Sequence, residues 1–247
     1  MKKPIRTVRW MLPLLLLSAC FSCATNAPLE MLSYPAVEGD HQSRMVIFLR
    51  GRGGSHTDFE TYGFVDEIRR RGLSYDMVAP DSHFGYYIGR SLVPRLKSDI
   101  IDPAKAAGYR EIWLVGASMG GLGALIYHKN HPGDIAGIYI ISPYLGGRDV
   151  ISGIRSAGGL KQWSPGVYDA EKHWDIMLWH WLKDQAETGW TEAPIYLGYG
   201  TEDMFIDAQR LLTEALPSSR VFTTGGGHTS SAMKQVWVDF LEAGVMK

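Results

Sequence analysis

A serine between glycines stands where an apolar, strand-like pattern gives way to a helical one. Ser118 lies in the run Gly-Ala-Ser-Met-Gly-Gly at 116–121, directly after the apolar segment 112–115. A sharp turn from strand to helix forces a strained backbone on the serine, and neighbouring glycines leave room for it. The turn exposes the hydroxyl at the carboxyl end of the strand, where it can act as a nucleophile. A glycine-rich turn kept small only for packing would show the same residues.

A serine nucleophile needs a base to take its proton and a third group to orient that base. Two later residues follow expected strands at suitable places. Asp203 comes just after the fifth expected strand, and His228 comes just after the sixth and before the last helix. Glu202 or Asp207 would serve in place of Asp203, and His228 could instead be an ordinary loop residue.

With these three motifs the chain resembles the α/β-hydrolase superfamily, and within it the compact bacterial esterases. The similarity runs from about residue 44 onward. The resemblance implies that Ser118 is the nucleophile, His228 the general base and then acid, and Asp203 the acid that orients the histidine. It also implies a covalent acyl-enzyme and a reaction that needs no cofactor.

The same resemblance assigns two backbone N–H groups to the oxyanion that forms on attack. One belongs to Met119, the residue after the nucleophile, and the other to Arg52. Many relatives have His-Gly in the loop that supplies the second donor, whereas this chain has Arg-Gly-Arg-Gly from Arg50 onward. Arg50, or else Arg52, is a candidate for binding an anionic substrate. The other role open to such an arginine is an ion pair with a nearby carboxylate such as Asp81.

Strand and helix patterns alternate along the chain that carries these residues. Strands are expected at 45–49, 75–79, 112–115, 138–141, 195–199 and 220–223, and helices at about 58–71, 92–100, after Ser118, 207–216 and 231–242. Such alternation predicts an α/β fold with a doubly wound, mostly parallel sheet of about six strands and helices on both faces. One hydrolase domain, 44–247, accounts for it. Ligands of such sheets bind beyond the carboxyl ends of the strands.

Aromatic residues are concentrated in two places outside this alternation. The segment 144–191 is predicted to be a small insert, and its later part is rich in tryptophan. Those tryptophans either pack the insert down or form a wall of the substrate site. Tyr86 and Tyr87, in an aromatic loop that begins at His83, are likewise candidates for lining the substrate site or covering the core.

The N-terminus has the layout of a secretory signal peptide. A basic stretch precedes the apolar run 11–17, which is too short to span a bilayer as a helix. The sequence Leu-Ser-Ala-Cys that ends at Cys20 resembles the lipobox of bacterial lipoproteins, in which the cysteine is lipidated after cleavage. This resemblance predicts a signal peptide 1–19 and a lipidated tether and lead-in segment 20–43.

Phe21 stands where an aspartate would resemble a signal for inner-membrane retention. Its presence favours the outer membrane, with the protein facing the periplasm or the exterior. An ordinary signal peptide cut near Ala19 or Ala24 is the alternative.

Composition excludes several classes of site. A formal net charge of −1 gives no basis for nucleic-acid binding. Both cysteines, Cys20 and Cys23, lie in the tail, which excludes a catalytic thiol and a cysteine metal site in the domain. His128 and His131 have a spacing that can bind metal but lack a third ligand, so we expect a surface pair and no metal.

The sequence therefore predicts an exported, lipid-anchored serine hydrolase that acts on small or short-chain carboxylic esters. Cleavage of thioesters or amides and acyl transfer to an alcohol stay open, because the same triad performs them. A non-catalytic lipoprotein, or a module that binds lipid or peptide through the insert, is the alternative of a different class.

Overall fold

The computed structural model describes residues 27–36 and 43–247. The predicted signal peptide 1–19 and the predicted lipidation site Cys20 lie outside the described residues. Among the residues that are described, no helix combines the length and the apolarity needed to cross a bilayer.

The core of the fold is one seven-stranded sheet in the order β1-β3-β2-β4-β5-β6-β7. The strands are β1 (Met31–Tyr34), β2 (Arg44–Leu49), β3 (Asp76–Pro80), β4 (Glu111–Ala117), β5 (Gly137–Ile141), β6 (Ile195–Gly200) and β7 (Val221–Thr224). All neighbours are parallel except β1 and β3. The doubly wound sheet predicted from the sequence is confirmed, and its six parallel strands fall where the apolar runs predicted them.

The antiparallel edge strand β1 lies within the segment 20–43, for which the sequence predicted a tether and lead-in and no strand. Its pairing runs from Met31 opposite Pro80 to Tyr34 opposite Met77. Only Tyr34 is buried, so the short strand shows little apolar alternation. Hydrogen bonds to β3, which no local pattern reveals, make it a strand.

The central strands are uninterrupted apolar runs because both of their faces are covered. Four consecutive residues of β2, from Val46 to Leu49, are fully buried, as are the last four of β5. A parallel sheet with two covered faces requires this pattern. The two faces belong to two separate apolar clusters, one around Ile47 and Leu114 and one around Phe48 and Trp237.

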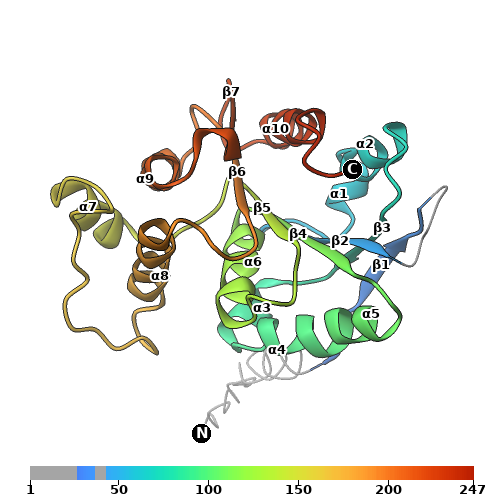
Figure 1. Cartoon of the computed structure of the whole chain (residues 1–247), viewed down its shortest axis with the longest axis horizontal. Coiled ribbons are helices and arrows are strands. Elements are labelled where there is room, and N and C mark those ends of the chain that lie inside the picture. The colour runs from blue at the N-terminus through green and yellow to red at the C-terminus, as the bar shows by residue number, and fades with distance from the viewer. Residues whose placement is uncertain (1–26, 37–42) are drawn as a thin grey trace, which may run out of the picture.

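Helices lie on both faces of the sheet. They are α1 (Asp58–Thr61), α2 (Phe64–Arg70), α3 (Phe84–Ile88), α4 (Leu92–Leu96), the π-helical turn η2 (Lys97–Ile101), α5 (Asp102–Ala106), α6 (Met119–Asn130), α7 (Arg148–Ser156), α8 (Trp174–Thr188), α9 (Ile206–Ala215), the 3-10 turn η3 (Ser218–Arg220) and α10 (Ser230–Glu242). Figure 1 shows α1, α2 and α10 on one side of the sheet and α3 to α6 on the other. Accordingly, Phe59 of α1, Phe64 of α2 and Trp237 of α10 belong to one cluster, and Leu92 of α4 and Leu122 of α6 belong to the other.

Three helical segments differ from the prediction. The single helix expected at 58–71 is divided into α1 and α2 at Gly63, whose φ of 74° ends the first helix. The helix expected at about 92–100 is α4 followed by η2, and the chain continues directly into α5, which has Pro103 in its first turn. The aromatic loop expected from His83 forms the short helix α3, and the His83 Nδ1 atom caps it by accepting from Gly85 N–H at 3.1 Å.

The insert packs onto the rest of the domain through its tryptophans. Trp163, Trp179 and Trp190 are buried in the cluster on the α6 side of the sheet. The indole of Trp179 donates to the Leu145 carbonyl at 2.7 Å, and that of Trp190 donates to the Ala215 carbonyl at 2.9 Å. Of the two roles left open by the sequence, the structure gives these tryptophans the packing role.

Candidate active site

The turn that carries Ser118 joins β4 to α6 and has the expected strain. Ser118 has φ 54° and ψ −114°, a backbone conformation that residues other than glycine rarely adopt. A Cβ atom on Gly116 would collide with the Gly120 carbonyl, and one on Gly120 would collide with the Leu49 carbonyl at the end of β2. The glycines therefore let strand, helix and a neighbouring strand meet at the serine.

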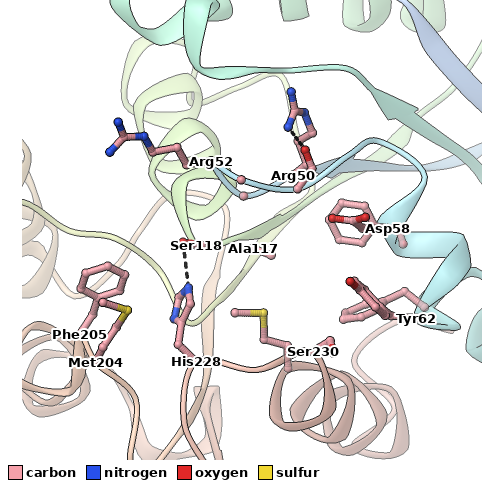
Figure 2. Close-up of a pocket in the computed structure, with 16 residues that line it drawn as sticks. Arg50, Arg52, Asp58, Tyr62, Ala117, Ser118, Met204, Phe205, His228 and Ser230 are labelled. Carbon is pink, nitrogen blue, oxygen red and sulfur yellow. Dashed lines mark hydrogen bonds between the residues drawn. The ribbon is translucent and has the colours of Figure 1, made fainter.

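Ser118, His228 and Asp203 form one hydrogen-bonded row. His228 Nε2 lies 3.1 Å from Ser118 Oγ and accepts from the hydroxyl (Figure 2). The opposite ring nitrogen, Nδ1, donates to Asp203 Oδ2 at 2.9 Å. The structure thus brings together the three residues that the sequence assigned to nucleophile, base and orienting acid. Ser118 and His228 are 110 positions apart in the chain.

The turns that hold the acid and the base are tied to each other. Asp203 follows β6 and donates its N–H to the Gly200 carbonyl at 3.0 Å, while Glu202 N–H donates to the Gly226 carbonyl at 2.9 Å. His228 follows β7, and the next residue, Thr229, caps α10. Because β6 and β7 are neighbouring parallel strands, their carboxyl ends bring the two side chains together.

The two alternative acids have other positions. Glu202 and Asp207 are exposed, and Asp207 pairs with Arg155 at 2.9 Å. Asp203 alone of the three is in contact with the His228 ring.

Asp203 is fully buried, and its environment favours the ionised form. Burial by itself raises the pKa of the carboxyl group, but hydrogen bonds from His228 and from the Phe205 amide, the latter at 2.8 Å, outweigh it, so the pKa is lowered from its ordinary value of 3.8. The carboxylate therefore keeps a negative charge opposite the His228 ring throughout the neutral range.

The loop after β2 lies directly against the serine. A Cβ atom on Gly51 would be 3.4 Å from the Ser118 Cβ. In the described part of the chain, nothing accepts a hydrogen bond from the N–H of Arg52 or of Met119. Both predicted oxyanion donors thus have N–H groups without an internal partner, next to the nucleophile.

Arg50 holds this loop in place and also contributes to the lining of the cavity at the serine. Its Nε lies 2.7 Å from Asp81 Oδ1, and its Nη1 donates to the Gly54 carbonyl. The side chain is only 10% exposed. The structure shows the second role that the sequence left open for Arg50, an ion pair with Asp81, while substrate binding by Arg50 stays a prediction.

A cavity of about 440 Å³ opens at the serine. Figure 2 shows Met204 and Phe205 on one side of Ser118 and His228, and Asp58 and Tyr62 on the other. The apolar part of the lining also includes Phe59, Phe64, Ala117 and Met233. Sequence reasoning missed these walls. Because Met204 and Phe205 directly follow Asp203, the sequence could have indicated them as lining residues. The wall formed by α1 and α2 results from tertiary packing, which the sequence does not reveal.

Tyr86 and Tyr87 do not line this cavity, so their predicted role in substrate binding is wrong. Tyr86 is buried in the core, and its ring lies 4.6 Å from that of His83. Tyr87 lies behind the nucleophile turn and donates its hydroxyl to the Met119 carbonyl at 3.0 Å. The sequence showed only that these aromatic residues follow a strand, and this does not determine whether their side chains reach the cavity or the core.

The histidine pair at the end of α6 has no metal-site geometry. His128 is buried, not on the surface, and its Nε2 lies 3.4 Å from Glu192 Oε2. Burial lowers the pKa of His128 to about 4, which keeps the ring neutral. Within residues 27–36 and 43–247, no three histidine, cysteine, aspartate or glutamate side chains gather so as to hold a metal ion.

Comparison with known proteins gives one family and one fold. The sequence matches the model of the family described as Putative esterase over residues 54–225, which include Ser118 and Asp203. No curated protein matches the sequence significantly.

Solved structures with the same fold include several hydrolases. The S-formylglutathione hydrolase from Agrobacterium tumefaciens is 14% identical with a TM-score of 0.59, covering 89% of this chain and 90% of its own. The S-formylglutathione hydrolase from Staphylococcus aureus is 12% identical with a TM-score of 0.57, covering 87% and 94%. A ferulic acid esterase is 15% identical with a TM-score of 0.58, covering 92% and 93%. At these identities the likeness establishes the α/β-hydrolase fold.

Replacing Gly120 by alanine should destabilise the protein. The added methyl group meets the Leu49 carbonyl, which the sheet holds in place, and overpacking of this kind costs about 3 kcal/mol. Urea denaturation measures the loss. Gly133→Ala is the matched control, because nothing lies within 4 Å of its added Cβ and little change is expected. Equal stability of the two variants would contradict the close approach of α6 to β2.

Replacing Asp203 by asparagine should lower kcat by about 10⁴-fold, because the amide cannot hold the histidine in the required tautomer. It should also change the pH dependence of stability. A carboxyl group with a lowered folded pKa stabilises the protein above its ordinary pKa of 3.8, and this contribution is lost as the pH falls through the folded value.

The difference in unfolding free energy between wild type and Asp203→Asn should therefore be constant in the neutral range and shrink below pH 3.8. Urea titrations at a series of pH values measure it. A difference that widens on acidification would show that the carboxylate is not stabilised by its partners.

Proposed function

The chain belongs to the esterase family, and from that membership and the geometry of its site we propose that it hydrolyses short-chain carboxylic esters through an acyl-enzyme on Ser118. The protein is a serine hydrolase of the α/β-hydrolase fold. The observation that carries the assignment of roles is the row of hydrogen bonds from Ser118 through His228 to Asp203 at the floor of an open cavity.

The acylation step follows from this row. Ser118 Oγ attacks the ester carbonyl while its proton passes to His228 Nε2. Asp203 stabilises the imidazolium that forms, and does so as a buried carboxylate already ionised. The carbonyl oxygen becomes an oxyanion, which the N–H groups of Met119 and Arg52 bind. Each such donor lowers the barrier by about 3 kcal/mol.

The intermediate then breaks down. His228 gives its proton to the leaving alcohol, the C–O bond breaks, and the acyl group stays on Ser118. A water molecule takes the place of the alcohol, loses its proton to His228 and attacks the acyl carbon. Collapse of the second intermediate returns the proton to Ser118 and releases the carboxylic acid.

The cavity supports substrates of modest size. Its volume of about 440 Å³ lies toward the small end of the usual range of about 300–1,000 Å³ for ligand pockets. Six of its sixteen lining residues are phenylalanine, tyrosine or methionine. These walls suit short apolar acyl and alcohol groups.

Replacing Ser118 by alanine should abolish labelling by a fluorophosphonate probe, which forms a covalent bond with an activated serine. The same change should lower kcat for 4-nitrophenyl esters by on the order of 10⁵- to 10⁶-fold. Ser218→Ala, at an exposed serine in η3, should be labelled and active as wild type. With esters of increasing acyl length, kcat/KM should fall beyond the short chains. Labelling that survives in Ser118→Ala would overturn the assignment of the nucleophile.

We also propose that the protein is exported and held at the outer membrane by a lipid on Cys20. The basic stretch, the short apolar run and the sequence Leu-Ser-Ala-Cys support this. Leu29 is already packed into the core, and its N–H donates to Asp99 Oδ2 at 2.9 Å. Nine residues of chain span at most about 30 Å, so the anchor would keep the domain close to the bilayer.

Replacing Cys20 by alanine should release the protein from the membrane. In a Gram-negative host, wild type should sediment with outer membranes and carry a diacylglycerol modification by mass spectrometry. Cys20→Ala should lose both properties, and Cys23→Ala should keep both. Equal fractionation of the two variants would contradict a lipid anchor at Cys20.

A further inference from the structure

The two arginines of the loop after β2 have different environments. Arg50 points into the protein and pairs with Asp81. Arg52, two residues on, is exposed, and no described carboxylate lies within 4.0 Å of its guanidinium. Since Arg52 also lines the catalytic cavity, it brings to that cavity a cation without a described carboxylate partner.

The Arg52 guanidinium has a defined position. Its central carbon lies 4.4 Å from the ring centroid of Phe84, a distance at which a cation is attracted to the face of an aromatic ring. Phe84 is the first residue of α3, and His83 caps that helix. Stacking on one face leaves the guanidinium edge, which carries the N–H donors, free for a planar anion.

The position of the Arg52 guanidinium relative to the other residues of the cavity lining restricts which part of a bound substrate it can contact. In Figure 2, Arg52 extends above and to the left of Ser118, and Met204 and Phe205 lie below and to the left. Asp58, the one carboxylate of the cavity lining, is on the opposite side and accepts from Ser55 N–H at 2.9 Å. The cation and the carboxylate of the lining therefore lie on opposite sides of Ser118.

We propose that Arg52 is a specificity-determining residue that binds a carboxylate carried by the ester substrate. The inference rests on the proposed ester hydrolysis at Ser118. Since the Arg52 amide is assigned to the oxyanion, its side chain starts beside the reacting carbonyl. The anion it selects is therefore separated from that carbonyl by only a few bonds. An ester with a carboxylate in its acyl part or in its alcohol part has this form.

Two pairs of substrates test the proposal and separate the two placements of the charge. For the acyl part, mono-4-nitrophenyl glutarate is compared with 4-nitrophenyl valerate. For the alcohol part, 3-acetoxybenzoate is compared with phenyl acetate. The measured quantity is the ratio of kcat/KM for the anionic ester to that for the neutral one. Any general loss of activity cancels in this ratio.

In wild type the ratio should fall as salt is added, because screening weakens an exposed charge pair. Arg52→Gln should lower the ratio by about fivefold in one pair, as expected for an exposed ion pair, and Arg52→Glu should lower it further. Arg148→Gln is the matched control, since Arg148 is exposed and outside the cavity lining. The pair that responds identifies the part of the substrate that carries the charge. A ratio unchanged by Arg52→Gln in both pairs would overturn the proposal.

A second measurement does not depend on turnover. Phenylboronic acid forms a tetrahedral adduct with an activated serine, and 3-carboxyphenylboronic acid adds the carboxylate. The ratio of their inhibition constants against fluorophosphonate labelling should favour the carboxylate in wild type and lose that preference in Arg52→Gln. Ser118 labelling with no such preference would overturn the role of Arg52 alone. No Ser118-dependent labelling at all would overturn the proposed function together with this inference.

Discussion

The site depends on how closely three backbone segments approach one another at Ser118. The end of β4, the first turn of α6 and the end of β2 meet there, and the glycines at 116 and 120 occupy the points where a Cβ atom would strike a carbonyl. This contact fixes the strained serine backbone and places the loop after β2 against its side chain. The positions of the oxyanion donors and of the cavity follow from it.

The buried charge of Asp203 is stabilised because the turns after β6 and β7 bring hydrogen-bond donors to the carboxylate. His228 and the Phe205 amide satisfy it, and the bonds between the two turns prevent them from separating. The position of His228 comes from β7 and from the start of α10, whose Trp237 and Phe240 pack against the sheet.

The two arginines of the loop after β2 have different partners in the structure. Arg50 and Arg52 are equivalent candidates in the sequence, since both flank the same glycine in the same loop. In the structure, Asp81 at the end of β3 takes one of them, because β3 lies next to β2 in the sheet. The other stacks on Phe84 with no described carboxylate near it. Arg50 thus has a structural partner because β2 and β3 are neighbours in the sheet, which brings Asp81 close to it.

By itself, the sequence determined the parallel sheet, the nucleophile turn and the order of the candidate triad, because these depend on local apolar runs and on glycine at fixed spacing. It did not determine β1, the division at Gly63 or the side reached by Tyr86 and Tyr87. Only the tertiary structure decided those, together with the α1–α2 wall of the cavity and the partner of Arg50. Each depends on contacts between segments distant in the chain, and no local pattern of residues records which segments will meet.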